Sequence, residues 1–188
     1  MAIASNRFKF TVEDLYVLDN LGLFGDRKVE LWDGDIIEMS INPPHANSVT
    51  ALINRFAGEF FNRALVTSQN PLDLGEPDKL PQPDVMLLKP IQFLDEAGRA
   101  RHPKPEEVLL LVEVADSSLL DDQTRKLKTY AQHGIQEYWI ADLNHQTWWV
   151  YREPQNDTYR LTTSYRFDEA FAPLAFPDTN RAWLALQV

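Results

Sequence analysis

Apolar residues recur three and four positions apart over about residues 45–63, and this spacing predicts a helix with one buried face. A shorter helix is predicted from Thr11 to Asn20, because Asp14 follows Thr11 at the spacing of a weak capping box. The apolar face of the longer helix comprises Val49, Leu52, Ile53, Phe56 and Phe60.

Short β-prone runs predict the strands of a sheet. Asp33-Gly34 separates two such runs in KVELWDGDIIEMS, and this dipeptide is the strongest short-range signal for a hairpin. Residues 84–88 and 107–114 are apolar runs of the length expected for buried strands. Further strands are predicted at residues 65–68, 136–142, 147–153 and 158–165.

The order of these elements predicts the fold class. A helix is predicted over residues 119–133, where Gly134 provides the C-terminal stop. The order helix, hairpin, helix, three strands, helix, three strands is typical of an α/β protein with a mixed β-sheet flanked by α-helices. We expect one domain over residues 1–188, in which residues 145–188 form the C-terminal hairpin and tail.

Composition and charge exclude several classes of protein. The chain has no cysteine, which excludes disulfides, thiolate metal sites and a cysteine nucleophile. No apolar window is long enough to cross a membrane, and the N-terminal residues lack the pattern of a secretory signal, so we expect a cytoplasmic protein. The net charge of −10, from 28 acidic and 18 basic residues, opposes non-specific attraction to nucleic acid.

Glu113 stands at the end of an apolar run, where an unpaired charge is costly. Asp84 opens the preceding predicted strand. If the two strands pair antiparallel, the start of one lies opposite the end of the other, and both carboxylates share one edge of the sheet. Such carboxylates repel each other unless a hard cation with oxygen ligands neutralises them. The sequence therefore predicts an Mg²⁺ or Mn²⁺ site formed by Asp84 and Glu113.

Asp122, Lys126 and Tyr130 are spaced by four residues and share one face of the predicted helix. From this face the Lys126 ammonium group is expected to reach the acidic edge. Two acids, a metal and a lysine suit phosphodiester hydrolysis, because the metal acidifies water and the lysine offsets charge in the transition state. Two alternatives stay open: an ordinary ion pair between Lys126 and Asp122, or Lys128 in place of Lys126.

Three segments in this order resemble one family: QPDVMLL, LLLVEVADSS and DDQTRKLKTYAQHGIQEYWIAD. They are similar to the Uma-two family of bacterial endonucleases, a branch of the PD-(D/E)XK restriction-endonuclease-like superfamily. The VELWDGDIIEMS hairpin and the following PPH match as well, so the resemblance covers roughly residues 10–152. It implies a restriction-endonuclease-like fold and a homodimer. It also implies an Mg²⁺- or Mn²⁺-dependent endonuclease acting on nucleic acid, with DNA favoured.

The resemblance assigns the central residues by position. Asp84 matches the PD element, and Glu113 matches the acidic residue of the second element. The lysine that usually follows two residues later is missing, because position 115 is Ala. The resemblance implies that Lys126 replaces it from the following helix, with Asp122 as a supporting residue.

Two supporting residues and one departure complete the comparison. Glu30 matches an acid before the hairpin turn and is implied as a third metal carboxylate, although it is equally explained as a charge on the outer face of a strand. His45 matches a histidine at the edge of the site, with a turn residue as the alternative. Asp116 and Ser117 stand where many members carry Ser and Pro, which leaves the shape of that turn open.

Other aromatic and basic clusters give separate expectations. Trp148 and Trp149 point to opposite faces of a strand, so one is expected to be exposed at a subunit contact. The basic cluster of residues 99–104 is interpreted as a solvated loop and is also the best candidate for backbone phosphate contacts. Three aromatic residues are expected in the core rather than in base stacking: Tyr130, Tyr138 and Trp139.

Two further functions use the same residues. The first is a catalytically inactive, nuclease-like binding or assembly module, which the net charge of −10 and the lack of a separate DNA-reading domain favour. The second is a metal-dependent hydrolase of another phosphate ester.

Overall fold

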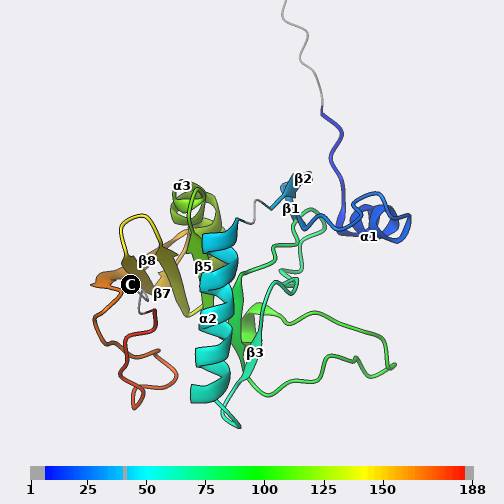
Figure 1. Ribbon diagram of the computed structural model, residues 1–188. Helices are drawn as coiled ribbons and strands as arrows, with labels where there is room; N and C mark the ends of the chain where they lie inside the picture. The colour runs from blue at the N-terminus through cyan, green and yellow to red at the C-terminus, as the bar shows by residue number, and fades with distance from the viewer. Residues whose placement is uncertain (1–6, 40–41, 185–188) are drawn as a thin grey trace, which may run out of the picture.

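The computed structural model describes residues 7–39 and 42–184 and contains two β-sheets (Figure 1). The larger sheet has six strands in the order β3-β4-β5-β6-β7-β8, and the smaller is the β1–β2 hairpin. Strands β5 and β6 pair in parallel, whereas the other neighbours in the larger sheet are antiparallel. The predicted α/β fold with a mixed sheet is therefore confirmed.

Each strand predicted from the sequence is present in the described residues. The bounds are β1 (Val29–Trp32), β2 (Asp35–Glu38), β3 (Leu65–Thr67), β4 (Val85–Leu88), β5 (Val108–Ala115), β6 (Glu137–Asp142), β7 (Thr147–Gln155) and β8 (Thr158–Arg166). Residue Gly34 has a φ of 75° in the β1–β2 turn, a conformation that glycine adopts without strain. The Asp33-Gly34 signal thus marks a true hairpin.

The helices begin at the capping signals. In α1 the Thr11 side chain accepts the Asp14 N–H at 3.1 Å, and the Asp14 carboxylate accepts the Thr11 N–H. In α2 the Asn42 side chain accepts the His45 N–H at 3.0 Å, so the helix starts two residues before His45 with prolines in its first turn. The bounds are α1 (Val12–Asn20), α2 (Pro43–Glu59), η1 (Pro105–Glu107), α3 (Leu119–Asp121), η2 (Asp122–Lys126) and α4 (Leu127–Gln132).

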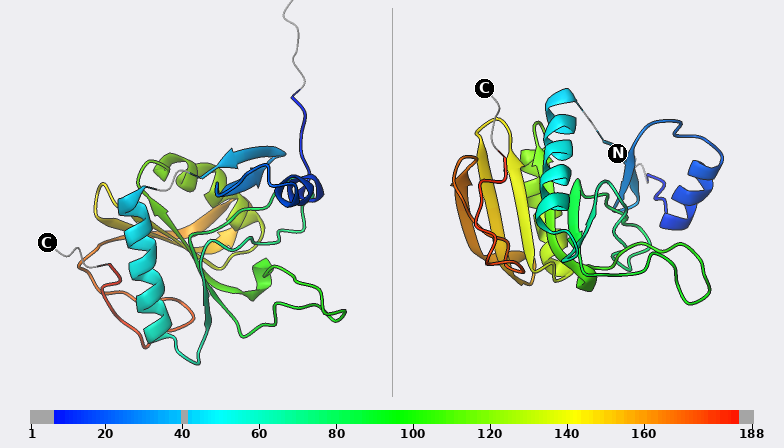
Figure 2. Two further views of the ribbon diagram at one scale, coloured as in Figure 1. Left: turned by 45° about the vertical axis from the view of Figure 1, so that its right-hand side comes forward. Right: turned by 60° about the horizontal axis from the view of Figure 1, so that its bottom comes forward.

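Helices cover both faces of the large sheet (Figure 2). Side chains alternate along β5: Leu110 and Val112 pack in the cluster that contains α2, whereas Leu111 and Ala115 pack in the cluster that contains α4. Glu113 has the same parity as Leu111 and therefore faces the helix that connects β5 to β6. This alternation places the acid on the side from which a lysine of that helix approaches.

The connection between β5 and β6 is a helix with one irregular turn. The Leu127 N–H bonds to the Asp122 carbonyl, five residues back, so the segment η2 is π-helical. The Tyr138 hydroxyl donates to the same carbonyl at 3.1 Å. The sequence predicts one continuous α-helix here. The four-residue spacing of Asp122 and Lys126 is compatible with an α-helix and with a π-helix, so it could not reveal the π-helical turn. Gly134 ends the helix with a φ of 73°, as predicted.

The expectation of an exposed tryptophan in β7 is wrong. Trp148 is fully buried beside the rings of Phe167 and Phe171, which follow β8 and fold back over the sheet. Trp149 is half-buried and packs against the cluster that contains Tyr130. Residues near the C-terminus cover one face of the strand, and the β7 sequence alone could not show this.

None of the helices within the described residues combines the length and hydropathy that crossing a bilayer requires. Two expectations from the sequence lie partly outside the described residues. The lack of a secretory signal concerns residues 1–6 in part, and the expected C-terminal tail includes residues 185–188.

Candidate active site

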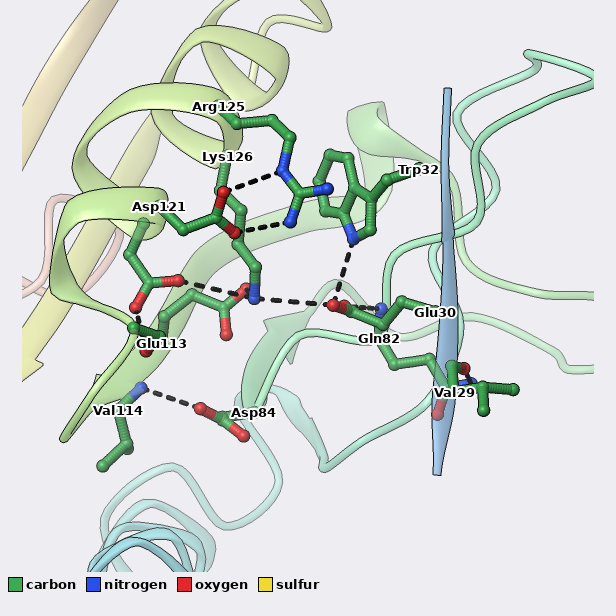
Figure 3. A network of polar contacts seen from close by, with 12 residues as sticks. Val29, Glu30, Trp32, Gln82, Asp84, Glu113, Val114, Asp121, Arg125 and Lys126 are labelled. Carbon is green, nitrogen blue, oxygen red and sulfur yellow. Dashed lines mark hydrogen bonds and ion pairs between the residues drawn. The ribbon is translucent and has the colours of Figure 1, made fainter. Parts of the chain in front are cut away.

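Asp84 and Glu113 lie at the same edge of the large sheet. Val85 of β4 pairs antiparallel with Val112 of β5, so the residue before one and the residue after the other are neighbours. Both acids are buried, each with 2% of its surface exposed. The Val114 N–H donates to Oδ2 of Asp84 at 2.8 Å and fixes this carboxylate to the adjoining strand (Figure 3). The two predicted acids therefore meet.

Lys126 reaches this edge from the helix, as Figure 3 shows. Its Nζ atom lies 3.1 Å from Oε1 of Glu113, 3.5 Å from Oδ1 of Asp122 and 3.8 Å from Oε2 of Glu30. Only 6% of the lysine surface is exposed. The π-helical turn leaves Asp122 and Lys126 on one face, and the ammonium group ends within a ring of three carboxylates.

Glu30 joins the cluster from the β1–β2 hairpin. Its Oε1 accepts the Gln82 N–H at 2.7 Å, and its Oε2 accepts the indole N–H of Trp32 at 3.0 Å (Figure 3). Glu30 is buried, so the interpretation of this residue as a charge on an outer face is wrong. Both oxygens have donors already, and the carboxylate faces Lys126.

His45, in the first turn of α2, faces the acidic edge. Its Nε2 lies 3.0 Å from Oδ2 of Asp84, and the residue is buried. Burial lowers the pKa of His45, but the hydrogen bond and charge of Asp84 outweigh burial and raise the pKa overall. The turn after Glu113 is tied to the same helix, because the Asn42 amide donates to the Asp116 carboxylate. The histidine thus lies in the first turn of α2 and contacts Asp84.

Burial and charge act in opposite directions on the central pair. Burial raises the pKa of Glu113 well above its ordinary value of 4.5, and the charge of Lys126 opposes this shift. Burial lowers the pKa of Lys126, but Glu113 and Glu30 outweigh it and hold the pKa well above 10.5. The lysine is therefore a permanent cation at neutral pH.

A cavity of about 210 Å³ opens at this edge of the sheet. Oδ1 of Asp84 is buried and has no hydrogen-bond partner among the described residues, which suits an atom that binds a cation. In the described part of the chain, no three acidic or histidine side chains are grouped closely enough to hold a metal by themselves. Mg²⁺ often takes one or two carboxylates and completes its shell with water and phosphate oxygens. Asp84 and Glu113 therefore fit such an ion, and Glu30 does not complete a three-carboxylate group.

The structure shows where two other basic candidates of the sequence lie: Lys128 and the cluster of residues 99–104. Lys128 lies on the surface, where its Nζ is 3.7 Å from Asp157, so Lys126 is the lysine that faces the edge. The connection over residues 89–107 joins the other ends of β4 and β5 and extends away from the N-terminal end of α2 (Figure 1). The interpretation of residues 99–104 as the best source of phosphate contacts is therefore wrong, because an antiparallel pair places its connecting loop opposite the Asp84–Glu113 edge.

Sequence reasoning missed the roles of two residues at the site. The hydroxyl of Tyr130, fully buried as expected for a core residue, donates to Oε1 of Glu113 at 2.8 Å. Arg125 borders the cavity, and its guanidinium carbon lies 4.5 Å from the centroid of the Trp32 ring. The position of Tyr130 four residues after Lys126 was a sequence signal for its contact with Glu113. The contact between Arg125 and Trp32 joins the helix to a hairpin distant in sequence, and no sequence pattern indicated it.

The model of one protein family, described as "Putative restriction endonuclease", matches residues 12–187. The chain belongs to the Uma2 family. The match extends past residue 152, where the sequence resemblance ends, and so includes the C-terminal hairpin and most of the tail. No curated protein matches the chain.

A solved structure has the same fold as this Uma2 protein. It is described as a putative nuclease belonging to DUF820 from Anabaena variabilis, and it shares 18% sequence identity with this chain. The match covers 80% of this chain and 83% of the other, with a TM-score of 0.62. This likeness confirms the mixed sheet flanked by helices.

Proposed function

We propose that this Uma2 protein is a divalent-metal-dependent endonuclease that hydrolyses phosphodiester bonds of nucleic acid, with DNA as the favoured substrate. The observation that carries the proposal is the buried group of Asp84, Glu113 and Lys126 at the mouth of one cavity. Burying charges is costly unless they serve as partners for each other or for a ligand.

Asp84 and Glu113 are the proposed holders of Mg²⁺ or Mn²⁺. The free Oδ1 of Asp84 supports this role, and Tyr130 and Lys126 both contact the same Oε1 of Glu113. When bound, such an ion supplies charge for phosphate oxygens and makes water more acidic. Asp84 is held in place by Val114 and His45, so its position does not depend on the ion.

Lys126 is proposed to orient the attacking water and to offset the extra negative charge that develops in the transition state. Its ammonium group is fixed by Glu113, Asp122 and Glu30 before any substrate arrives. We assign Glu30 to the orientation of Lys126 rather than to metal binding, because both its oxygens already accept hydrogen bonds. His45 orients Asp84.

The homodimer and the cytoplasmic location implied by the sequence are also proposals. The homodimer is no longer supported by an exposed tryptophan, because Trp148 is buried and Trp149 is half-buried. Light scattering coupled to gel filtration measures the mass of the particle and decides between monomer and dimer.

The function is tested with closed circular DNA, which an enzyme that needs a strand end cannot attack. The protein is incubated with the DNA and Mg²⁺ or Mn²⁺, beside Asp84→Asn and the surface control Asp157→Asn. We expect cutting by the wild type and by Asp157→Asn, and none by Asp84→Asn or in the presence of a chelator. Equal cutting by the wild type and Asp84→Asn points to a contaminating nuclease. No cutting of DNA or RNA by the wild type favours the inactive module.

A further inference from the structure

The cavity beside Lys126 is strongly acidic for a site that receives a phosphate. Two of its lining residues, Arg125 and Lys126, are permanent cations. Lys126 is buried within the ring of Glu113, Asp122 and Glu30, whereas 29% of the Arg125 side chain is exposed. Six acids line the cavity: Glu30, Glu38, Asp84, Glu113, Asp116 and Asp121.

The Arg125 guanidinium is held from two sides. Its Nε donates to Oδ1 of Asp121 at 2.8 Å, and its Nη2 donates to Oδ2 of the same residue at 2.6 Å. One face of the group lies over the Trp32 ring. Figure 3 shows the third nitrogen, Nη1, on the side away from Asp121. None of the described residues accepts a hydrogen bond from Nη1.

We propose that Arg125 binds a backbone phosphate of the nucleic acid through Nη1, beside the phosphodiester that is cut. This inference rests on the proposed function and adds the contact by which an acidic protein holds a polyanion. The guanidinium is oriented before binding by Asp121 and Trp32, so little side-chain freedom is lost when the phosphate arrives. A contact to the backbone fixes the position of the strand without reading its sequence.

A purely structural role for Arg125 makes a different prediction. In that case the arginine only attaches the helix to Trp32, with Asp121 as its necessary partner. Replacing either member of the Arg125–Asp121 pair then has the same effect on nucleic-acid binding. If Arg125 contacts phosphate, the two substitutions differ: Arg125→Gln weakens binding, whereas Asp121→Asn does not, because it removes a negative charge that competes with the phosphate.

The test is fluorescence anisotropy of a short labelled DNA duplex with the full chain in Ca²⁺, a hard cation that prefers the same oxygen ligands. We expect Arg125→Gln to weaken binding about tenfold. The slope of log affinity against log salt should become shallower by about 0.9, the value for one lost phosphate contact. Arg125→Lys, which keeps the charge, should restore the slope. Asp121→Asn should bind as tightly as the wild type or more tightly.

Arg99→Gln is the matched control. Arg99 pairs with Asp95 at the same four-residue separation, and it lies in the loop at the far ends of β4 and β5. Its replacement removes an equal charge and should leave affinity and salt slope unchanged. The inference is overturned if Arg125→Gln binds like the wild type, if Asp121→Asn weakens binding as Arg125→Gln does, or if the wild type binds no DNA.

Cleavage is measured separately, so the inference and the proposed function fail in different ways. A wild type that cuts DNA, with an unchanged KM in Arg125→Gln, overturns the phosphate contact and leaves the nuclease. A wild type that binds DNA through Arg125 but cuts nothing overturns the nuclease and leaves the contact. Thermal unfolding of Arg125→Gln checks that the hairpin and the helix still fold together.

Discussion

The Nζ atom of Lys126 lies 3.1 Å from Oε1 of Glu113, although the lysine belongs to a helix and the acid to a strand. Both residues are buried, and the same carboxylate oxygen also accepts the Tyr130 hydroxyl. Breaking a buried ion pair from one side leaves a charge without a partner, which is strongly destabilising. This relationship makes the site sensitive to small substitutions in ways that separate stability from activity.

Replacing Lys126 with Met should affect both properties. It leaves Glu113, Asp122 and Glu30 without their common cation, so we expect a loss of about 3 kcal/mol in the free energy of unfolding at neutral pH. We also expect the rate of DNA cleavage to fall at least about a hundredfold. Urea unfolding and cleavage assays measure the two effects. Lys128→Met is the control and should change neither, so equal effects of the two substitutions would refute the assignment.

Tyr130→Phe removes one hydroxyl and tests whether that group orients Glu113. The buried carboxylate loses a donor, so we expect a loss of about 1–3 kcal/mol in stability. Because Glu113 is less firmly held, the affinity for Mn²⁺ should fall about tenfold in calorimetry. Tyr138→Phe removes a buried hydroxyl that donates to a backbone carbonyl instead. This control should lose similar stability at unchanged Mn²⁺ affinity, whereas a parallel fall in affinity would count against a specific role for Tyr130.

Glu30→Gln distinguishes a partner of Lys126 from a metal ligand. If Glu30 only orients the lysine, the substitution lowers kcat for DNA cleavage and leaves Mn²⁺ affinity within about twofold of the wild type. A metal ligand would instead show a large loss of affinity. Glu38→Gln serves as the control, because Glu38 borders the same cavity but is exposed. If Glu30→Gln loses Mn²⁺ affinity and Glu38→Gln does not, Glu30 is a metal ligand and the assignment to Lys126 is contradicted.

The contact between α1 and the loop over residues 89–107 should depend on pH. The Tyr16 hydroxyl and Nε2 of His102 are hydrogen-bonded, and burial lowers the pKa of His102 below 6.5 against the opposing charge of Asp73. The unfolded chain therefore binds a proton more readily than the folded one, and stability falls as pH drops below 6.5. As the pH drops below 6.5, the thermal unfolding temperature of His102→Gln should fall less than that of the wild type. An identical pH dependence in the two proteins would contradict this prediction.

Patterns along single segments were enough to predict much of this structure. The apolar runs before Glu113 and after Asp84 define neighbouring strands, and antiparallel pairing of consecutive strands then brings the two acids together. The four-residue spacing of Asp122 and Lys126 placed the lysine on the correct face. The homologous family supplied Glu30 and His45, which no local pattern could assign.

Contacts between distant segments were beyond the reach of the sequence. The Arg125–Trp32 contact joins a helix to the β1–β2 hairpin, and neither segment carries a sign of the other. Trp148 is buried by Phe167 and Phe171, and Trp149 is half-buried against the cluster that contains Tyr130, so alternation along the strand alone gave a wrong expectation of an exposed tryptophan. Residues 99–104 lie between the strands of Asp84 and Glu113 in sequence, which suggested that they are near the site. Strand β4 runs away from Asp84, however, so this loop lies at the opposite end of the sheet.

Calorimetric titration with Mn²⁺ tests the proposed cation site between Asp84 and Glu113, and it requires neither a substrate nor an assumption about the nucleic acid. We predict a binding event in the wild type that disappears in Asp84→Asn and in Glu113→Gln and persists in Asp157→Asn. Binding of equal affinity in all four proteins, or no binding to the wild type, would contradict a cation site between Asp84 and Glu113.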